Sequence, residues 1–424
     1  MPSSPSSTRR RARRRSRGFT LVELMVSLSG GLVVSLAVFA LARDSGRFYQ
    51  RESRVANATV SALLGFERLR TDIARTGFLS SPNALRDINV CARPQANWPT
   101  ALRSLASVQI TQPATTGGVL GANGRNPPSL LLSGSYSSAD SFPAHLEIDG
   151  PNITFQLLIN GGGLLRLGNG ASPTTDAMNT VFKPGRALRY VRYGVEFFGQ
   201  ILASVGGAAP TVTINSAPPM PQRSGSANQC GVTIINSGTG IGSINVVNFI
   251  QYSVRNLSTN AATVQGASDY ASLYTNSAAG PGEADRTELV RVEEDVNGAP
   301  MEGTEEVVAE YAVDLGFQLT AVTGVVGCCD PSFSVVLPTA GAFNTFTGDV
   351  YNSANTPELI RTLRVRLGVR SRESDRSAGM TADVGAPATQ GLYRFNLGTG
   401  AEPYARVRTF QADVALNNQQ DVLW

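Results

Sequence analysis

The sequence predicts an α+β protein in which a long N-terminal helix packs on a β-rich, mainly antiparallel globular domain. Three observations support this. Residues 19–42 form a long apolar run with a single charged residue, residues 55–73 repeat apolar positions at helical spacing, and the remainder alternates short β-branched runs with turn-forming residues. Charged residues make up only 16% of the chain, which suits a β-rich domain with many turns and long loops.

A basic leader occupies residues 1–18. It contains seven arginines and no acidic residue, so the formal charge of +4 for the whole chain becomes −3 for residues 19–424. The basic character therefore belongs to the leader, and the body is not expected to contact nucleic acid.

The apolar run from Phe19 to Ala42 contains one charged residue, Glu23. As a helix its 24 residues would extend about 36 Å, enough to cross a bilayer. A secretory signal peptide could be cleaved near Ala40-Leu41-Ala42, but the run is too long for that class. A plain membrane anchor fits the length and the basic flank, yet it leaves unexplained a carboxylate that costs about 2.5–3.5 kcal/mol at a bilayer centre.

The segment Gly18-Phe19-Thr20-Leu21-Val22-Glu23 resembles the class III signal of type IV pilins and pseudopilins. The resemblance implies that prepilin peptidase cuts between Gly18 and Phe19, that Phe19 becomes N-methylated, and that Glu23 acts in assembly. The new α-ammonium of one subunit can then pair with Glu23 of a neighbour, which offsets the cost of a buried charge.

An amphipathic helical half follows the apolar half. Its stripe of core positions is spaced 4, 3, 4, 3 and 4 residues apart, and consists of Val55, Thr59, Ala62, Phe66, Leu69 and Ile73. Gly77 is placed to end the helix, with Pro82 close behind. We therefore expect a nearly continuous helix over about residues 19–77, with residues 19–42 transmembrane. Gly30 and Gly31 mark a place where it could loosen or pack closely.

Three later segments extend the resemblance to PilW-like minor pilins of type IV pili. Residues 69–78 resemble the helix end of that family, with an Asp-Ile-x-x-x-Gly-aromatic pattern. Residues 287–318 and 360–370 resemble its C-terminal part in order and composition. The chain length also suits this family better than the smaller major pilins.

Residues 78–424 are expected to form the β-rich periplasmic or extracellular domain. Strands are predicted at 155–159, 245–254, 288–292, 316–320, 363–370 and 407–416. In the fifth of these, alternation places an arginine ladder of Arg364, Arg366 and Arg370 on the outer face. Residues 256–286 and 338–358 are expected to be long surface loops.

Four cysteines fit one or two disulfides of an exported protein, with three possible pairings: Cys91, Cys230, Cys328 and Cys329. Because Cys328 and Cys329 are adjacent, a bond between them would be strained, and they could instead pair elsewhere or stay reduced.

Other motifs do not indicate catalysis or a cofactor. The sequence has no Cys/His pattern of zinc sites, and its one histidine, His145, lacks a nucleophile motif. The glycine-rich segments 161–163 and 238–242 are interpreted as hairpin turns, and the acidic residues between Asp285 and Glu310 as a solvated face. We expect no enzyme, metal or cofactor.

The resemblance implies a PilW-like minor pilin that primes type IV pilus assembly, with a place at the pilus tip as an option. Its partners would be prepilin peptidase, other minor pilins, the major pilin and the inner-membrane assembly machinery. The expected topology is an inner-membrane single pass with a cytoplasmic N-terminus and a periplasmic body, and later a place in the pilus at the cell surface. A J-like pseudopilin of type II secretion and a monomeric membrane-anchored binding protein remain alternatives.

Overall fold

The computed structural model describes residues 19–91, 98–111, 123, 126–149, 152–159, 162–215, 222–223, 232–233, 241–257, 286–322, 333–336, 356–372, 374, 392–397 and 404–420. The chain divides into two units, Met1–Asn57 and Ala58–Trp424. Helix α1 (Leu21–Arg75) begins in the first unit and ends in the second. The predicted α+β class, with a long N-terminal helix followed by a mainly antiparallel β-rich domain, is confirmed.

The first unit contains the apolar half of α1. Its stretch Leu21–Gly46 has a mean hydropathy of 2.3 and is long and apolar enough to cross a membrane. None of its most hydrophobic window is buried within the chain. This half therefore has no internal core and needs an apolar environment from outside.

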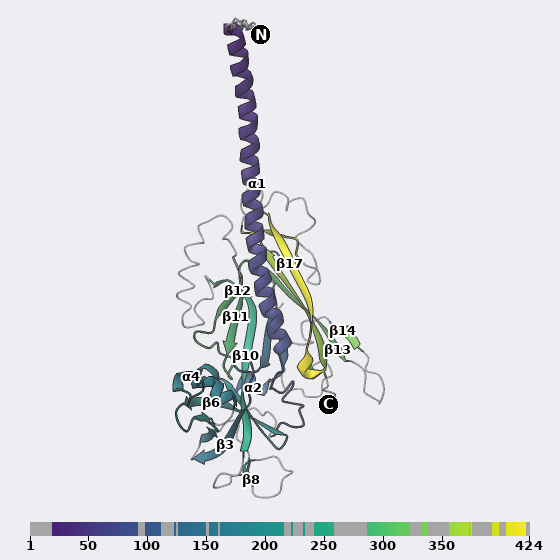
Figure 1. The fold of residues 1–424 in the computed structure, drawn as a ribbon. Helices are drawn as coiled ribbons and strands as arrows, with labels where there is room; N and C mark the ends of the chain where they lie inside the picture. The colour runs from purple at the N-terminus through teal and green to yellow at the C-terminus, as the bar shows by residue number, and fades with distance from the viewer. Residues whose placement is uncertain are drawn as a thin grey trace, which may run out of the picture. The chain divides into compact units, whose positions relative to one another are not determined.

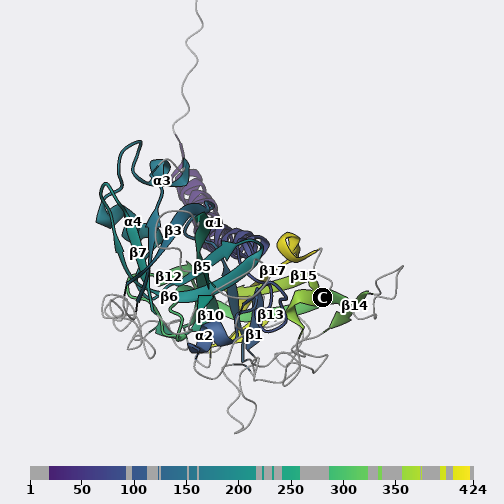
Figure 2. The same ribbon diagram turned by 90° about the horizontal axis from the view of Figure 1, so that it is seen from below.

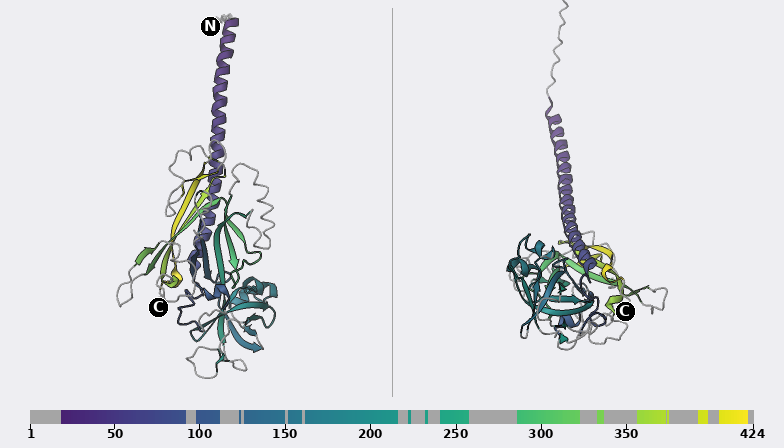
Figure 3. Two further views of the ribbon diagram at one scale, coloured as in Figure 1. Left: turned by 180° about the vertical axis from the view of Figure 1, so that it is seen from behind. Right: turned by 60° about the horizontal axis from the view of Figure 1, so that its bottom comes forward.

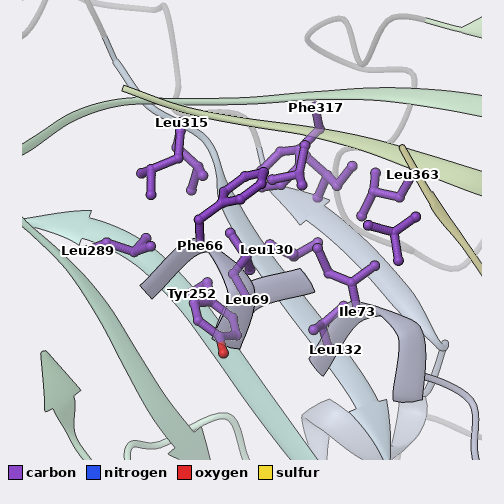
Figure 4. Close-up of a cluster of buried hydrophobic side chains, with 14 of the residues drawn as sticks. Phe66, Leu69, Ile73, Leu130, Leu132, Tyr252, Leu289, Leu315, Phe317 and Leu363 are labelled. Carbon is purple, nitrogen blue, oxygen red and sulfur yellow. The ribbon is translucent and has the colours of Figure 1, made fainter. Parts of the chain in front are cut away.

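In the second unit, residues 58–75 of α1 lie between two sheets (Figure 1; Figure 3, left). Four residues of the stripe predicted from spacing are buried: Ala62, Phe66, Leu69 and Ile73 are at most 4% exposed. Thr59 is partly buried, and the Val55 side chain lies outside the described part of the structure. Figure 4 shows Phe66 between Leu315 and Phe317 on one side and Leu289 on the other. One hydrophobic core thus joins the helix to both sheets.

The first sheet has five antiparallel strands in the order β14-β13-β15-β17-β16. These are β13 (Ala312–Val322), β14 (Phe333–Val336), β15 (Ile360–Arg370), β16 (Arg394–Asn396) and β17 (Tyr404–Ala415). Alternate residues of β13, β15 and β17 face α1, as the period of two requires.

The second sheet has ten strands, and six of them close into a barrel. Strand β10 pairs with both β3 and β5, so the order β10-β3-β4-β7-β6-β5 returns to β10. The barrel strands are β3 (Phe142–Asp149), β4 (Asn152–Leu157), β5 (Ala187–Arg192), β6 (Val195–Val205), β7 (Thr211–Ile214) and β10 (Ile241–Arg255). Figure 2 shows β3, β5, β6 and β7 grouped around this part of the domain.

Strand β10 connects the barrel to the rest of the domain. Its first half lies in the barrel, and its second half pairs with β2 (Ser129–Gly134) and β11 (Glu288–Glu294). Strands β1 (Val108–Thr111) and β12 (Glu306–Ala309) flank these two. The half-sheet β1-β2-β10-β11-β12 is the one that packs on α1.

The remaining elements are short: α2 (Thr100–Arg103), α3 (Gly162–Leu167), α4 (Thr175–Val181), the 3-10 turns η4 (Pro357–Leu359) and η6 (Asn417–Gln419), and β8 (Gln222–Arg223) with β9 (Val232–Thr233). The β8–β9 pair is parallel. Leu164 of α3 and Met178 of α4 are buried in the barrel's hydrophobic cluster.

Four of the six predicted strands lie within observed ones, whereas the predicted strands 155–159 and 407–416 extend past the ends of β4 at Leu157 and β17 at Ala415. The predicted loops 256–286 and 338–358 lie almost entirely outside the described residues, as do Gly238, Thr239 and Gly240. The turn predicted at glycines 161–163 is wrong, because Gly162 is the first residue of α3.

Two predictions about charged residues are also wrong. Arg370 is 1% exposed and lies against the rings of Tyr311 and Phe395, so only part of the predicted arginine ladder faces outward. The acidic run is not one solvated face, because Glu288 and Glu293 are buried. Each is compensated by an arginine, Arg286 and Arg186 respectively.

Candidate functional site at the head of the N-terminal helix

The head of α1 is where the sequence predicts processing and assembly. Gly18 lies outside the described residues. Phe19 is 83% exposed, and the helix begins two residues later at Leu21. The residue that would carry the new N-terminus is therefore accessible in the isolated chain.

Thr20 and Glu23 form a reciprocal cap on the helix. The backbone N–H of Thr20 donates to Glu23 Oε2 at 3.2 Å, and the Thr20 hydroxyl donates to the same oxygen at 3.1 Å. The N–H of Glu23 in turn donates to Thr20 Oγ1 at 3.2 Å. This is a capping box, in which a threonine and a glutamate three residues apart satisfy each other's backbone N–H groups.

The capping box gives Glu23 a local role besides pairing with another subunit. It supplies two donors to a carboxylate in an apolar stretch, which reduces the cost of keeping it there. Thr20 was not among the predicted site residues. Its signal was present, since Thr-x-x-Glu before an apolar run is the sequence pattern of this cap.

Below the head, the helix surface is apolar on all sides. The large apolar side chains from Phe19 to Leu41 are exposed, by 55–83%. Glu23 is therefore an isolated acidic group on an apolar helix, one turn from its start, with its carboxylate held towards the N-terminus by Thr20.

At its other end, α1 is anchored to the domain by a buried ionic network. Asp72 is 4% exposed and accepts from Arg291 Nε and from the Tyr252 hydroxyl, each at 2.8 Å. Tyr136 donates to the Asp72 carbonyl at 2.9 Å. Burial, and to a lesser extent Asp72, raises the pKa of Tyr252, so its hydroxyl remains a donor. Asp72 lies off the predicted apolar stripe, and it is buried because these donors compensate its charge.

Two glycines have distinct structural roles in this half of α1: one allows close approach to the domain, and the other ends the helix. A Cβ at Gly65 would lie 2.1 Å from the carbonyl oxygen of Val308 in β12, so only glycine permits this contact. Gly77 ends the helix with φ +74°, as predicted for a C-terminal stop. The Asn418 amide donates to the Thr76 carbonyl at 2.9 Å, at the end of the helix where backbone carbonyls lack intrahelical donors.

Cys91 is the one predicted disulfide candidate within the described residues. It is 4% exposed, packs in the barrel's hydrophobic cluster and is disulfide-bonded. Cys230, Cys328 and Cys329 lie outside the described residues.

No group of three or more histidine, cysteine, aspartate or glutamate side chains within the described part of the chain is arranged to hold a metal ion. His145 lies on β3, paired with Ile241 of β10.

Comparison with known proteins gives one match. Residues 13–29 match the family model for the prokaryotic N-terminal methylation motif, a span that contains Gly18, Phe19, Thr20 and Glu23. No curated protein and no solved structure shows significant similarity to the chain. The motif, which is of the prepilin type, and the apolar helix that follows it characterise a membrane-anchored protein of the type IV pilin or pseudopilin kind.

Proposed function

We propose that this protein is a PilW-like minor pilin that primes assembly of type IV pili and can remain at the pilus tip as a structural subunit. The observation that carries the proposal is the methylation motif at residues 13–29, placed at the head of a membrane-length helix that leads into a β-rich domain. This arrangement suits a subunit that is stored in a membrane and then polymerised.

Processing would begin on the cytoplasmic side of the inner membrane. The arginines of residues 1–18 keep the leader there, by the positive-inside rule, and the domain is exported to the periplasm. The disulfide at Cys91 suits that oxidising compartment. Prepilin peptidase then cuts between Gly18 and Phe19, and Phe19 is N-methylated.

Assembly would use the charge created by the cut. The ammonium of Phe19 on one subunit pairs with Glu23 of an adjacent subunit, where both are removed from water. The attraction between the two charges becomes stronger as the local dielectric constant falls. An incoming subunit is therefore favoured only in the register that places its charge beside that of its neighbour. Thr20 holds the Glu23 carboxylate towards the helix head until that partner arrives.

The other subunits are other minor pilins and the major pilin, joined by the inner-membrane assembly machinery. The protein's role is structural and not enzymatic. A J-like pseudopilin of type II secretion would have the same kind of head and a β-rich domain. Flanking genes for minor pilins or for secretion components distinguish the two.

The test compares two acidic residues of α1, Glu23 and the exposed Glu52. Glu23→Ala should still be cleaved after Gly18, yet its amount in sheared fibres, relative to cell membranes, should fall at least tenfold. Glu52→Ala should be incorporated normally. Incorporation of Glu23→Ala at the wild-type level would overturn the pairing mechanism.

A further inference from the structure

The six-stranded barrel has a mainly aliphatic and aromatic interior, into which one phenol projects. Tyr190 of β5 is 0% exposed, and its ring centroid lies 5.0 Å from that of Phe155 and 6.1 Å from that of Phe197. The ring lies against Gly242 of β10, where a Cβ would be 2.6 Å from the Tyr190 hydroxyl oxygen. Glycine at this position therefore makes room for the phenol beside β10.

An arginine lies next to this phenol at one end of the barrel. Arg192 follows Tyr190 by two residues on β5, so both occupy the same side of the strand. The residue opposite Arg192 is Val195 of β6, which packs against the barrel's hydrophobic cluster. The guanidinium carbon lies 4.9 Å from the centre of the Tyr193 ring, and Tyr193 is 79% exposed. Arg192 is therefore placed where the interior of the barrel meets solvent.

Two donors at this end of the barrel have no acceptor among the described residues. They are the Tyr190 hydroxyl and Arg192 Nε, and both atoms are buried. Burial raises the pKa of Tyr190, and the nearby charge of Arg192 lowers it to a lesser extent, so the phenol keeps its proton. Because buried donors without acceptors are costly, two of them side by side indicate a site for an acceptor.

The barrel itself supplies no carboxylate to this end. None of the acidic residues on the barrel strands occupies an inward position, by the alternation of the strands; they are Glu147, Asp149 and Glu196. The segments 150–151 and 216–240, which connect strands at this end, contain no aspartate or glutamate. A negative charge beside Arg192 is therefore expected from a ligand.

We propose that this end of the barrel binds a small organic carboxylate that carries a ring. One guanidinium matches the single charge of a carboxylate, and Nε–H with a neighbouring N–H can form two parallel hydrogen bonds to its oxygens. The Tyr190 hydroxyl supplies a third donor. The exposed ring of Tyr193, beside the guanidinium, offers an apolar surface for the ring of the ligand. This site does not depend on the proposed function, because it lies entirely within the barrel.

Isothermal titration calorimetry of the full-length protein in mild detergent tests the proposal with two matched pairs of probes. Benzoate and glucuronate each carry a ring and a carboxylate, whereas benzamide and glucose are uncharged. We expect at least one of the two carboxylates to bind at least tenfold more tightly than its uncharged counterpart, and more tightly than inorganic phosphate. Failure of both carboxylates to bind, or tighter binding of phosphate, would overturn the proposal.

Variants locate the binding at these side chains. Arg192→Gln should weaken carboxylate binding at least tenfold, and Arg192→Lys, which lacks the planar fork, should not restore it. Tyr190→Phe removes a hydroxyl that has no partner within the described chain, so it should weaken binding at least threefold without lowering the unfolding temperature. The control Arg408→Gln changes an exposed arginine of β17 and should bind like the wild type. Carboxylate binding that survives both Arg192→Gln and Tyr190→Phe would refute the site.

Discussion

Replacing Gly65 by alanine should separate α1 from the sheet on which it packs. The added Cβ would lie 2.1 Å from the Val308 oxygen and 2.9 Å from its carbonyl carbon. Ordinary van der Waals contact needs about 3.5 Å, so helix and strand must move apart by roughly 1.4 Å to restore it. The opposing atoms are backbone, which cannot rotate away as the end of a flexible side chain could.

The magnitude follows from two opposing terms. Overpacking of this kind costs about 1–3 kcal/mol, and the shift would also loosen the contacts of Phe66 and Leu69. Alanine regains up to about 1 kcal/mol of helix propensity. We therefore expect Gly65→Ala to lower the free energy of unfolding by about 1–2 kcal/mol.

Urea unfolding of the full-length protein in mild detergent, followed by the fluorescence of the buried Trp98, measures this change. The matched control is Gly46→Ala in the same helix, where an added Cβ meets no atom within 4 Å. That control should be neutral or slightly stabilising. Gly65→Ala with wild-type stability would refute the close approach of α1 to β12.

Three further predictions concern single side chains. Burial raises the pKa of Glu294 to about 7. Ionisation of this carboxylate therefore lowers the stability of the folded protein. The loss is absent below pH 4.5, grows as the pH rises and is complete above pH 7. Glu294→Gln should thus stabilise the protein at pH 8, by at most ~3 kcal/mol, but should not stabilise it at pH 4.5. Urea unfolding at the two pH values measures this difference, and equal effects at both would contradict the prediction. Cys91→Ser should lower stability by about 2–5 kcal/mol, and peptide mapping of the wild type should find Cys91 in a disulfide rather than as a free thiol. Thr20→Val removes the hydroxyl from the capping box and should reduce incorporation into fibres, whereas Thr20→Ser should restore it; normal incorporation of the valine variant would leave Thr20 without a role in holding Glu23.

Much of the fold follows from local sequence patterns. The buried stripe of α1 was visible as a period of 3.6 residues, and the strands as β-branched or alternating runs. These are short-range signals, because each depends on a residue and its neighbours along one element. These short-range patterns do not indicate which strands are neighbours in a sheet.

The barrel could not be predicted from the sequence, because local patterns do not show which strands are neighbours. Its closure depends on β10 pairing with β3 and β5, which come from distant parts of the chain, and no local pattern encodes that register. The burial of Arg370, Glu293 and Asp72 was missed on similar grounds. A charged residue is buried when a distant partner compensates it, and that partner is identified only once the strands are placed.

The candidate site was more accessible to sequence reasoning, because it lies within six consecutive residues. The roles of the glycine, the phenylalanine and the glutamate could be proposed because this segment resembles the class III signal of type IV pilins and pseudopilins. The resemblance assigns no role to Thr20, but Thr20 and Glu23 also match the Thr-x-x-Glu pattern of a helix cap.

Mass spectrometry of the N-terminal peptide, from both membranes and sheared fibres, tests the central claim most directly. The account predicts a peptide that begins at Phe19 and carries one added methyl group on its α-amine. A chain that still begins at Met1, or one that begins at Arg43 after removal of the apolar run, would contradict it.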